Sequence, residues 1–261
     1  MLTYTRPKVL VINDEPDIRR LIIDIQEDSA LSNDEMESLG SAMQRRSLEL
    51  QAAMRKVDSS YSSTLVALVA ALDAREHETA AHSFRVRAYT SHMARLAGYP
   101  AALLPQLEQA ALLHDIGKFA VPDAILLKPD KLTTEEFALL KEHSVVGEQI
   151  VSRIDHFRDS AAIIRHHHER YDGSGYPDRL VCDQIPLGSR IFAFADTLDA
   201  MTSDRCYRKA LTFAEARSEI CECAGTQFDP RLTQLFLRIP DSTLMDLRVS
   251  AERECPPRTV Q

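Results

Sequence analysis

Apolar residues recur at spacings of three and four along most of the chain between residues 64 and 240, which is the periodicity of amphipathic helices. No segment of this stretch shows a convincing alternation of apolar and polar positions, the pattern of a half-buried strand. Helix starts are marked by capping boxes at Thr133–Glu136 and Thr212–Glu215. The pattern therefore predicts an all-α helical bundle over residues 64–240. After Pro240 the chain turns polar, and we expect residues 241–261 to form a polar tail that ends disordered.

The first 33 residues have a different pattern, a short apolar strand followed by one helix. The strand, Val9–Ile12, runs into Asn13 and Asp14. This segment resembles the opening of a response-regulator receiver domain, whose first strand ends in a pair of metal-binding acids. The phospho-acceptor Asp and the later Thr/Ser and Lys of a receiver are missing, and a single βα unit cannot bury its own sheet. We interpret residues 1–33 as a truncated, receiver-like segment that does not work as a switch.

Residues 34–63 are predicted to form a helix with the hydrophobic repeat of a coiled coil. Its seam, with alternating spacings of four and three, consists of Leu50, Met54, Val57, Tyr61 and Leu68, with the polar Thr64 at one position, and Met36 and Met43 extend it backwards at intervals of seven. A single amphipathic helix packed on its own domain would show the same pattern. We favour a dimeric coiled coil, and therefore expect a homodimer.

Histidines and carboxylates interrupt the apolar helical stripes where core residues are expected. His82 heads the inward stripe Val86, Tyr89, Met93 and Leu96, and His143 shares a face with Leu140, Gly147, Ile150 and Ile154. The histidines are His82, His114, His143, His167 and His168, and the carboxylates that accompany them are Glu78, Asp115 and Asp196. A buried imidazole or ionised carboxylate is costly unless it is paired or bound to a metal. A single histidine on an apolar face is more often a hydrogen-bonded core residue. The repeated combination of histidine with carboxylate, from separate segments, instead indicates convergence on one polynuclear metal centre.

Composition narrows the class of protein. The net charge of −8 argues against a general nucleic-acid binder, although small phosphorylated ligands remain compatible with local basic clusters. The cysteines form no CxxC pair, which indicates reduced thiols without disulfides; they are Cys182, Cys206, Cys221, Cys223 and Cys255. The N-terminus carries no signal peptide, and the longest apolar stretch, Leu65–Leu72, is too short to span a bilayer. We expect a cytoplasmic protein with no membrane partner.

The donor types suggest a reaction. Imidazole and carboxylate without thiolate suit Fe, Mn or Zn. Two metals about 3.5–4 Å apart can share a hydroxide that attacks phosphorus. Asp115 directly follows His114 and is the natural bridging carboxylate. Lys118 lies one turn further and could stabilise a non-bridging oxygen or assist the leaving group, although a lysine past a helix end is otherwise an ordinary surface residue.

Two ordered motifs carry a family resemblance. Residues 114–118 read His-Asp-Ile-Gly-Lys, and residues 167–177 read His-His-Glu-Arg-Tyr-Asp-Gly-Ser-Gly-Tyr-Pro. From about residue 65 to 236 the chain is similar to HD-GYP phosphodiesterases, metal-dependent hydrolases of the bacterial messenger cyclic di-GMP. The resemblance implies an HD-domain helical bundle. It also implies a set of metal ligands, namely His82, His114, Asp115, His143, His167, His168 and Asp196.

The same resemblance bears on the number of metals and on the substrate. Most family members bind two divalent ions, Fe or Mn here by expectation, and a subset with Glu at the position of Glu78 holds a third. Arg205 and Arg208 match family positions that contact the substrate phosphate, although a solvated basic helix end has the same pattern. The glycine-rich loop can place Tyr176 beside a ligand base. Arg179 and Cys182 stand where the family usually has glycine, which puts the loop's shape in question.

The expected function is hydrolysis of cyclic di-GMP to linear pGpG, with GMP as an alternative final product, and with Asp115 and Lys118 as catalytic residues. Two alternatives remain open at this point. One is hydrolysis of another cyclic dinucleotide, such as 3′,3′-cGAMP. The other is a nucleotide-binding or scaffold protein that docks a GGDEF-type cyclase and catalyses little. Chromatography of the products would separate these alternatives.

Overall fold

The computed structural model describes residues 33–76, 81–204 and 209–255, in two compact units that divide between Ser62 and Ser63. Several residues singled out from the sequence lie outside the described part of the chain. They are the receiver-like residues 1–32, Glu78, Arg205, Cys206 and Arg208.

The described part of the first unit is the beginning of the long helix α2 (Asn33–Glu76). Three of the seam residues on it are exposed, with Leu50 at 62%, Met54 at 60% and Val57 at 52% of their full accessible area, whereas Tyr61 is half-buried.

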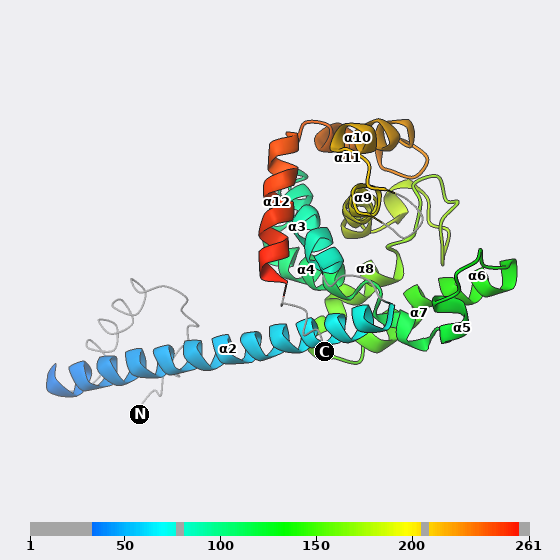
Figure 1. Ribbon diagram of the computed structural model, residues 1–261. Helices are drawn as coiled ribbons and strands as arrows, with labels where there is room; N and C mark the ends of the chain where they lie inside the picture. Colours follow the sequence, from blue (N-terminus) through cyan, green and yellow to red (C-terminus); the bar gives the residue numbers. More distant parts are fainter. Residues whose placement is uncertain (1–32, 77–80, 205–208, 256–261) are drawn as a thin grey trace, which may run out of the picture. The chain divides into compact units, whose positions relative to one another are not determined.

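The second unit is built around helix α3 (Ala81–Leu96), which packs against α4 (Leu104–Leu113), α9 (Leu187–Thr202) and α12 (Asp241–Glu254) (Figure 1). The inward face of α3 buries Val86, Tyr89 and Met93, as the spacing predicted. The ends of the expected stripes are less buried, since Leu96 is 47% exposed. The part of α2 after Ser62 belongs to this unit and buries Leu65, Val69 and Leu72.

A second group of helices carries the histidine motifs. It comprises η2 (Ile116–Ala120), α5 (Asp123–Leu126), α6 (Thr134–Lys141), α7 (His143–Val151), η3 (Asp155–Ser160) and α8 (Ala161–Arg165). Helix α7 packs against η2 and α8. The contact with η2 depends on Gly117, where a Cβ would lie 1.8 Å from the carbonyl oxygen of His143. Glycine therefore lets the His-Asp motif approach the third histidine.

Four further helical elements complete the second unit. They are η1 (Ala101–Leu103), η4 (Cys182–Gln184), α10 (Phe213–Glu222) and α11 (Pro230–Phe236). Both predicted capping boxes are confirmed, at Thr133–Glu136 and Thr212–Glu215. The described residues form no β-strand, only an isolated bridge between Ala224 and Phe228, which confirms the all-α prediction. In the described part of the chain, every helix is too short or too polar to cross a membrane.

Two expectations about helices are wrong. The helical unit extends beyond the boundary expected at Pro240, because residues 241–254 form α12, which buries Leu244 and Ala251 and pairs Glu254 with Arg87 on α3. These two apolar positions lie among charged residues, so the sequence shows no clear apolar stripe there. The end of the polar tail, where we expect disorder, lies outside the described residues. The expected inward face of α7 also differs: Ile150 and Ile154 are both 37% exposed, because the inward positions after His143 are Gly147 and Val151.

Candidate metal centre

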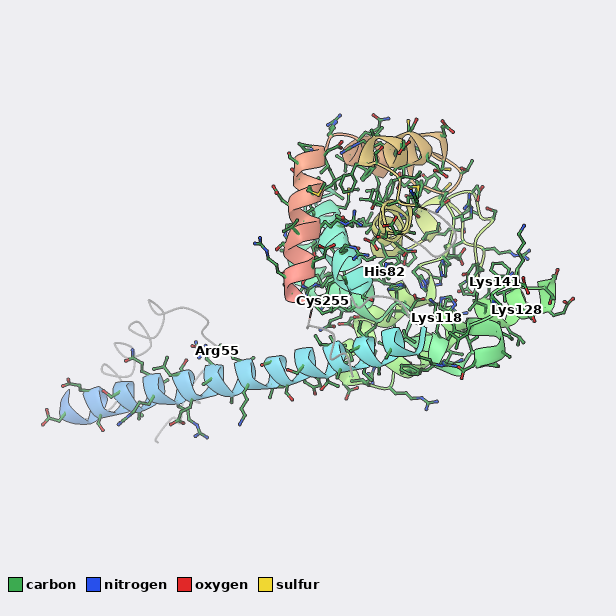
Figure 2. The ribbon with its side chains drawn as sticks, in the orientation of Figure 1. Arg55, His82, Lys118, Lys128, Lys141 and Cys255 are labelled. Atoms are coloured by element: carbon green, nitrogen blue, oxygen red, sulfur yellow. The ribbon has the colours of Figure 1, made fainter. Side chains whose placement is uncertain are left out.

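The structure brings together every predicted metal ligand that it describes. Two groups of side chains each have their donor atoms within 4.8 Å of one another, one made of His82, His114 and Asp115 and the other of His143, His167 and His168. His82 belongs to α3, His143 to α7, and the others follow the ends of α4 and α8 (His82 is labelled in Figure 2). Asp196 on α9 lies beside the first group, with its Oδ1 3.6 Å from His82 Nε2.

Backbone carbonyls orient three of the five imidazoles. Nδ1 of His114 donates to the carbonyl oxygen of Ala111 at 3.0 Å, that of His143 to Leu140 at 2.7 Å and that of His167 to Ile164 at 2.6 Å. The accepting carbonyls belong to the last turns of α4, α6 and α8, where backbone oxygens lack partners within the helix. A carbonyl can only accept, so each of these rings carries a proton on Nδ1 and turns its Nε2 toward the centre. Histidines that bind metals use this arrangement.

In the second group, the facing Nε2 atoms carry no proton with which to form a hydrogen bond to each other. The Nε2 atoms of His143 and His167 are 3.3 Å apart, and both rings already donate through Nδ1. Burial, followed by the neighbouring imidazoles, holds the pKa of His167 well below its usual range. Burial and then His143 lower the pKa of His168 to about 4. Burial also lowers the pKa of His143. Three neutral imidazoles that face one another fit a divalent cation.

Asp115 lies between the two groups. Its Oδ2 is 3.0 Å from Nε2 of His114, and its Oδ1 is 3.5 Å from Nε2 of His143. Burial acts to raise the pKa of this carboxyl, but His114 and Lys118 hold it well below its usual range. The Nζ of Lys118 is 2.8 Å from Oδ2 (Lys118 is labelled in Figure 2). An ionised carboxylate with one oxygen toward each group is placed as a bridging ligand would be.

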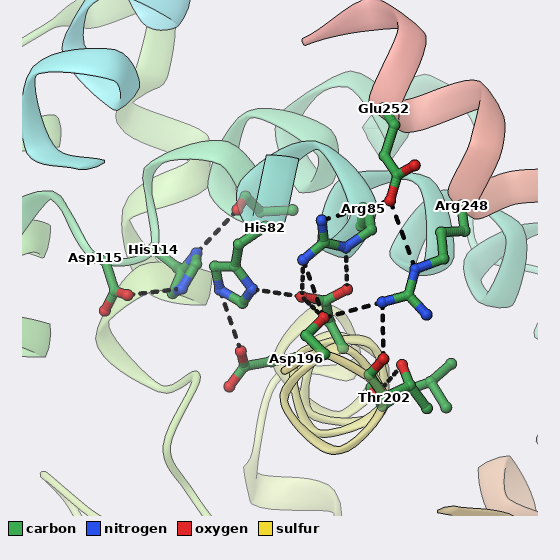
Figure 3. A network of polar contacts seen from close by, with 12 residues as sticks. His82, Arg85, His114, Asp115, Asp196, Thr202, Arg248 and Glu252 are labelled. Carbon is green, nitrogen blue, oxygen red and sulfur yellow. Dashed lines mark hydrogen bonds and ion pairs between the residues drawn. The ribbon is translucent and has the colours of Figure 1, made fainter. Parts of the chain in front are cut away.

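A buried ion pair fixes His82. Its Nδ1 lies 2.8 Å from Oδ2 of Asp199, and Arg85 donates to the same carboxylate through Nε at 2.5 Å and Nη2 at 2.9 Å (Figure 3). Asp199 is 1% exposed; burial opposes its ionisation, but His82 and Arg85 lower its pKa to about 2. The carboxylate thereby leaves Nε2 of His82 facing Asp196.

Sequence reasoning missed this support for His82. A signal was present, because Asp199 follows Asp196 by three residues and Arg85 follows His82 by three, which places each pair on one helix face.

A cleft of about 640 Å³ opens beside the second group. Its walls include His167, His168, Tyr176 and Asp196. The ring of Tyr176 lies over that of His168, with 4.8 Å between centroids and 31° between planes. The volume is within the range of small-molecule sites.

In the loop that carries Tyr176, two residues other than glycine adopt a backbone conformation that normally favours glycine. Arg179 has φ 55° and Cys182 has φ 52°, both in the left-handed region. The carboxylate of Glu169, which is 4% exposed, accepts hydrogen bonds from the backbone N–H of Asp178 at 2.7 Å and of Leu180 at 3.1 Å. Glu169, which the sequence analysis did not single out, therefore holds the loop where side chains replace glycine.

Comparisons with known proteins agree with this geometry. Residues 64–232 match the family model described as HD domain. The chain is 34% identical over 225 residues, 80% of its length, to a protein of Vibrio cholerae serotype O1 named cyclic di-GMP phosphodiesterase, and covers 46% of that protein. It is 38% identical over 203 residues, 76% of its length, to the cyclic di-GMP phosphodiesterase response regulator RpfG of Xanthomonas campestris pv. campestris, covering 54% of it.

A third relative has a different named substrate. The 3′3′-cGAMP-specific phosphodiesterase 2 of V. cholerae is 40% identical over 172 residues, which is 65% of this chain and 33% of the relative. The chain thus spans between a third and just over half of the length of these curated relatives. The crystal structure of a cyclic GMP-AMP-specific phosphodiesterase of V. cholerae superposes with a TM-score of 0.57 at 21% identity, covering 75% of this chain and 54% of that one. This likeness shows the shared fold.

Proposed function

We propose, on the premise that this chain belongs to the HD-domain family and to its HD-GYP branch, that it hydrolyses cyclic di-GMP to linear pGpG, with GMP as an alternative final product. The observation that carries the proposal is the position of Asp115, whose two oxygens face different histidine groups. Paired metal sites joined by a shared ligand suit in-line displacement at phosphorus, because both the attacking and the leaving oxygen need stabilisation. The relatives named cyclic di-GMP phosphodiesterases support the choice of substrate.

The described ligands divide between two divalent ions. One ion would be held by His82, His114, Asp115 and Asp196, and the other by Asp115, His143, His167 and His168. Glu78 would add a third ion, as in the family subset that carries Glu there. Nitrogen and carboxylate donors without thiolate suit Fe, Mn or Zn, and we propose Fe or Mn, the metals expected from the family resemblance. When bound, these ions supply Lewis acidity at the phosphodiester and a nucleophile at neutral pH.

The chain's own groups bind and orient the substrate. The ammonium of Lys118 is anchored 2.8 Å from Asp115 Oδ2, where it can donate to a non-bridging phosphate oxygen or to the leaving oxygen. Tyr176 covers His168 at the wall of the cleft and offers a face for a guanine base. Arg205 and Arg208 remain the proposed cationic contacts for the phosphates, in a bidentate geometry that guanidinium allows.

Product chromatography tests the proposal. The purified chain, supplied with Fe or Mn under anaerobic conditions, is offered cyclic di-GMP and 3′,3′-cGAMP in parallel. We expect pGpG from cyclic di-GMP, and no product from the Asp115→Asn variant. The second candidate substrate is 3′,3′-cGAMP, which the relative at 40% identity favours; faster turnover of this nucleotide would transfer the assignment to it. Binding without hydrolysis with either metal would favour the scaffold instead.

The partners we propose are a second copy of the chain and a GGDEF-type cyclase, in the cytoplasm. The exposed seam of Leu50, Met54 and Val57 supports the homodimer, because a coiled-coil partner would bury these side chains.

A further inference from the structure

Arg75, in the last turn of α2, clasps the turn that follows the His-Asp motif. Its Nη1 donates to the carbonyl oxygen of Lys118 at 2.8 Å, and its Nη2 donates to the carbonyl oxygen of Val121. Its Nε and Nη2 also lie 2.9 and 2.6 Å from Oδ1 of Asp123. All these residues belong to the second unit. One guanidinium thus joins three acceptors, 43 to 48 residues away along the chain.

The clasped turn needs outside support. It is η2, a 3-10 helix of five residues, and such helices have poorer hydrogen-bond geometry than α-helices. The carbonyl of Lys118 accepts one backbone bond, from the N–H of Val121 at 3.0 Å, and the bond from Arg75 is its second. On the other side, Gly117 lies against the carbonyl of His143. The turn is therefore held between Arg75 and the start of α7.

We propose that Arg75 is a positioning residue for Lys118, and that it acts on the reaction through the backbone of η2. The proposal rests on the proposed function, in which the ammonium of Lys118 meets the phosphodiester beside Asp115. Displacement of a catalytic group by about 1 Å can lower a rate by roughly a hundredfold. A guanidinium reaches three acceptors in one fixed plane, which the point charge of a lysine cannot do. The last turn of α2 thereby becomes part of the active-site scaffold.

Arg217 provides a matched control within the same unit. Its Nε and Nη2 lie 2.9 and 2.7 Å from Oδ1 of Asp241, and it also donates to the carbonyls of Phe236 at 3.2 Å and Ile239. Its side chain is 16% exposed, compared with 23% for Arg75. Both arginines therefore make one carboxylate contact and two carbonyl contacts, but the partners of Arg217 include no metal-ligand candidate and no part of η2.

The experiment compares Arg75→Met with Arg217→Met. We expect the two variants to lose thermal stability to a similar extent, whereas only Arg75→Met loses kcat, by about 10- to 100-fold with KM changed by less than about twofold. In a Lys118→Met background, Arg75→Met should lower kcat by no more than about twofold further, because the residue it positions is gone. An unchanged kcat in Arg75→Met, or losses that multiply in the double variant, would overturn the proposal.

Two additions keep the test decisive. If Arg75→Met does not fold, Arg75→Lys replaces it, and Asp123→Asn, which spares the carbonyl contacts, should retain kcat. If the wild type hydrolyses neither cyclic dinucleotide, the proposed function has failed. The readouts are then kcat for bis(p-nitrophenyl) phosphate and amide hydrogen exchange. Exchange at residues 118 and 121 should be faster in Arg75→Met and unchanged in Arg217→Met; equal exchange in all three proteins would overturn the proposal.

Discussion

The Nε2 atoms of His143 and His167 lie 3.3 Å apart, and each ring already donates its Nδ1–H to a backbone carbonyl. Two nitrogens without protons at this separation present their lone pairs to each other. A cation between them turns this repulsion into binding, whereas hydrogen bonding within the protein cannot. This relationship accounts for the burial of the two imidazoles together better than a structural role would.

Metal binding should depend on pH through His114. Burial acts to lower the pKa of this imidazole, but Asp115 raises it to about 9. Without a cation, His114 therefore carries a proton on Nε2 at neutral pH, and a metal must displace it. We predict that metal affinity rises by up to about tenfold per pH unit as pH increases toward 9, and levels off above that value. Calorimetric titrations with Mn²⁺ at several pH values, in buffers of different ionisation heat, measure the proton released. An affinity that is constant between about pH 6.5 and 8.5 would rule this out.

Asp199→Asn should weaken metal binding although Asp199 is not itself a proposed ligand. The amide keeps the volume but removes the charge that orients His82 and pairs with Arg85. We predict an affinity loss of about 10- to 100-fold, the usual effect of removing such a carboxylate.

Asp178→Asn is the control for this prediction. Asp178 Oδ2 lies 2.8 Å from Nε2 of His166 and 2.7 Å from Nε of Arg165, neither of which is a proposed metal ligand. Competition titration with a chromophoric chelator should show normal metal affinity in Asp178→Asn. Equal losses in the two variants would mean that Asp199 only stabilises the fold.

Cys182→Gly should stabilise the protein. Cys182 has φ 52°, where a residue with a Cβ is disfavoured by about 1–2 kcal/mol, and glycine removes this cost while gaining freedom in the unfolded chain. We predict a net gain of about 0.5–1 kcal/mol, which is a rise in Tm of roughly 1–4 °C. Cys221→Gly, within helix α10, should instead lower Tm. The idea fails if calorimetry shows Cys182→Gly melting at or below the wild-type temperature.

Because the seam on α2 is exposed, we predict a dimer that dissociates when charged side chains are introduced at the seam. Met54 and Val57 are 60% and 52% exposed on α2. The double substitution Met54→Glu and Val57→Glu should convert a dimer to a monomer at micromolar concentration in sedimentation experiments, because the charges would be buried between two helices. Leu48→Glu, also on α2 and 57% exposed but off the seam, should leave the dimer intact. A monomeric wild type would contradict the prediction.

The parts of this protein that could be predicted are those that leave a pattern within a short stretch of sequence. Apolar spacing and capping boxes located the helices, and the ordered His-Asp and Gly-Tyr-Pro motifs located the residues that meet at the centre. The tail was misread because α12 buries only Leu244 and Ala251 among charged residues. Local spacing also placed Ile150 and Ile154 inward, although the packing of α7 leaves both exposed.

The residues that support the centre could not be found in this way. Asp199 meets His82 across 117 residues, and Arg75 meets Asp123 across 48. Spacing placed Asp199 on the helix face of Asp196, but only the fold shows which charge each of these side chains meets. Glu169 was visible within the Gly-Tyr-Pro motif, but its two backbone hydrogen bonds depend on the left-handed conformation of Arg179 in the loop.

The central claim is that Asp115 joins two metal sites within one chain. The most direct test is the metal content of the anaerobically purified protein, determined by elemental analysis against protein concentration. We predict about two Fe or Mn ions per chain, or about three if Glu78 holds a further ion, and a loss of at least about one ion in Asp115→Asn. A fully loaded wild-type protein that binds only about one ion per chain, with the same content in Asp115→Asn, would contradict the claim.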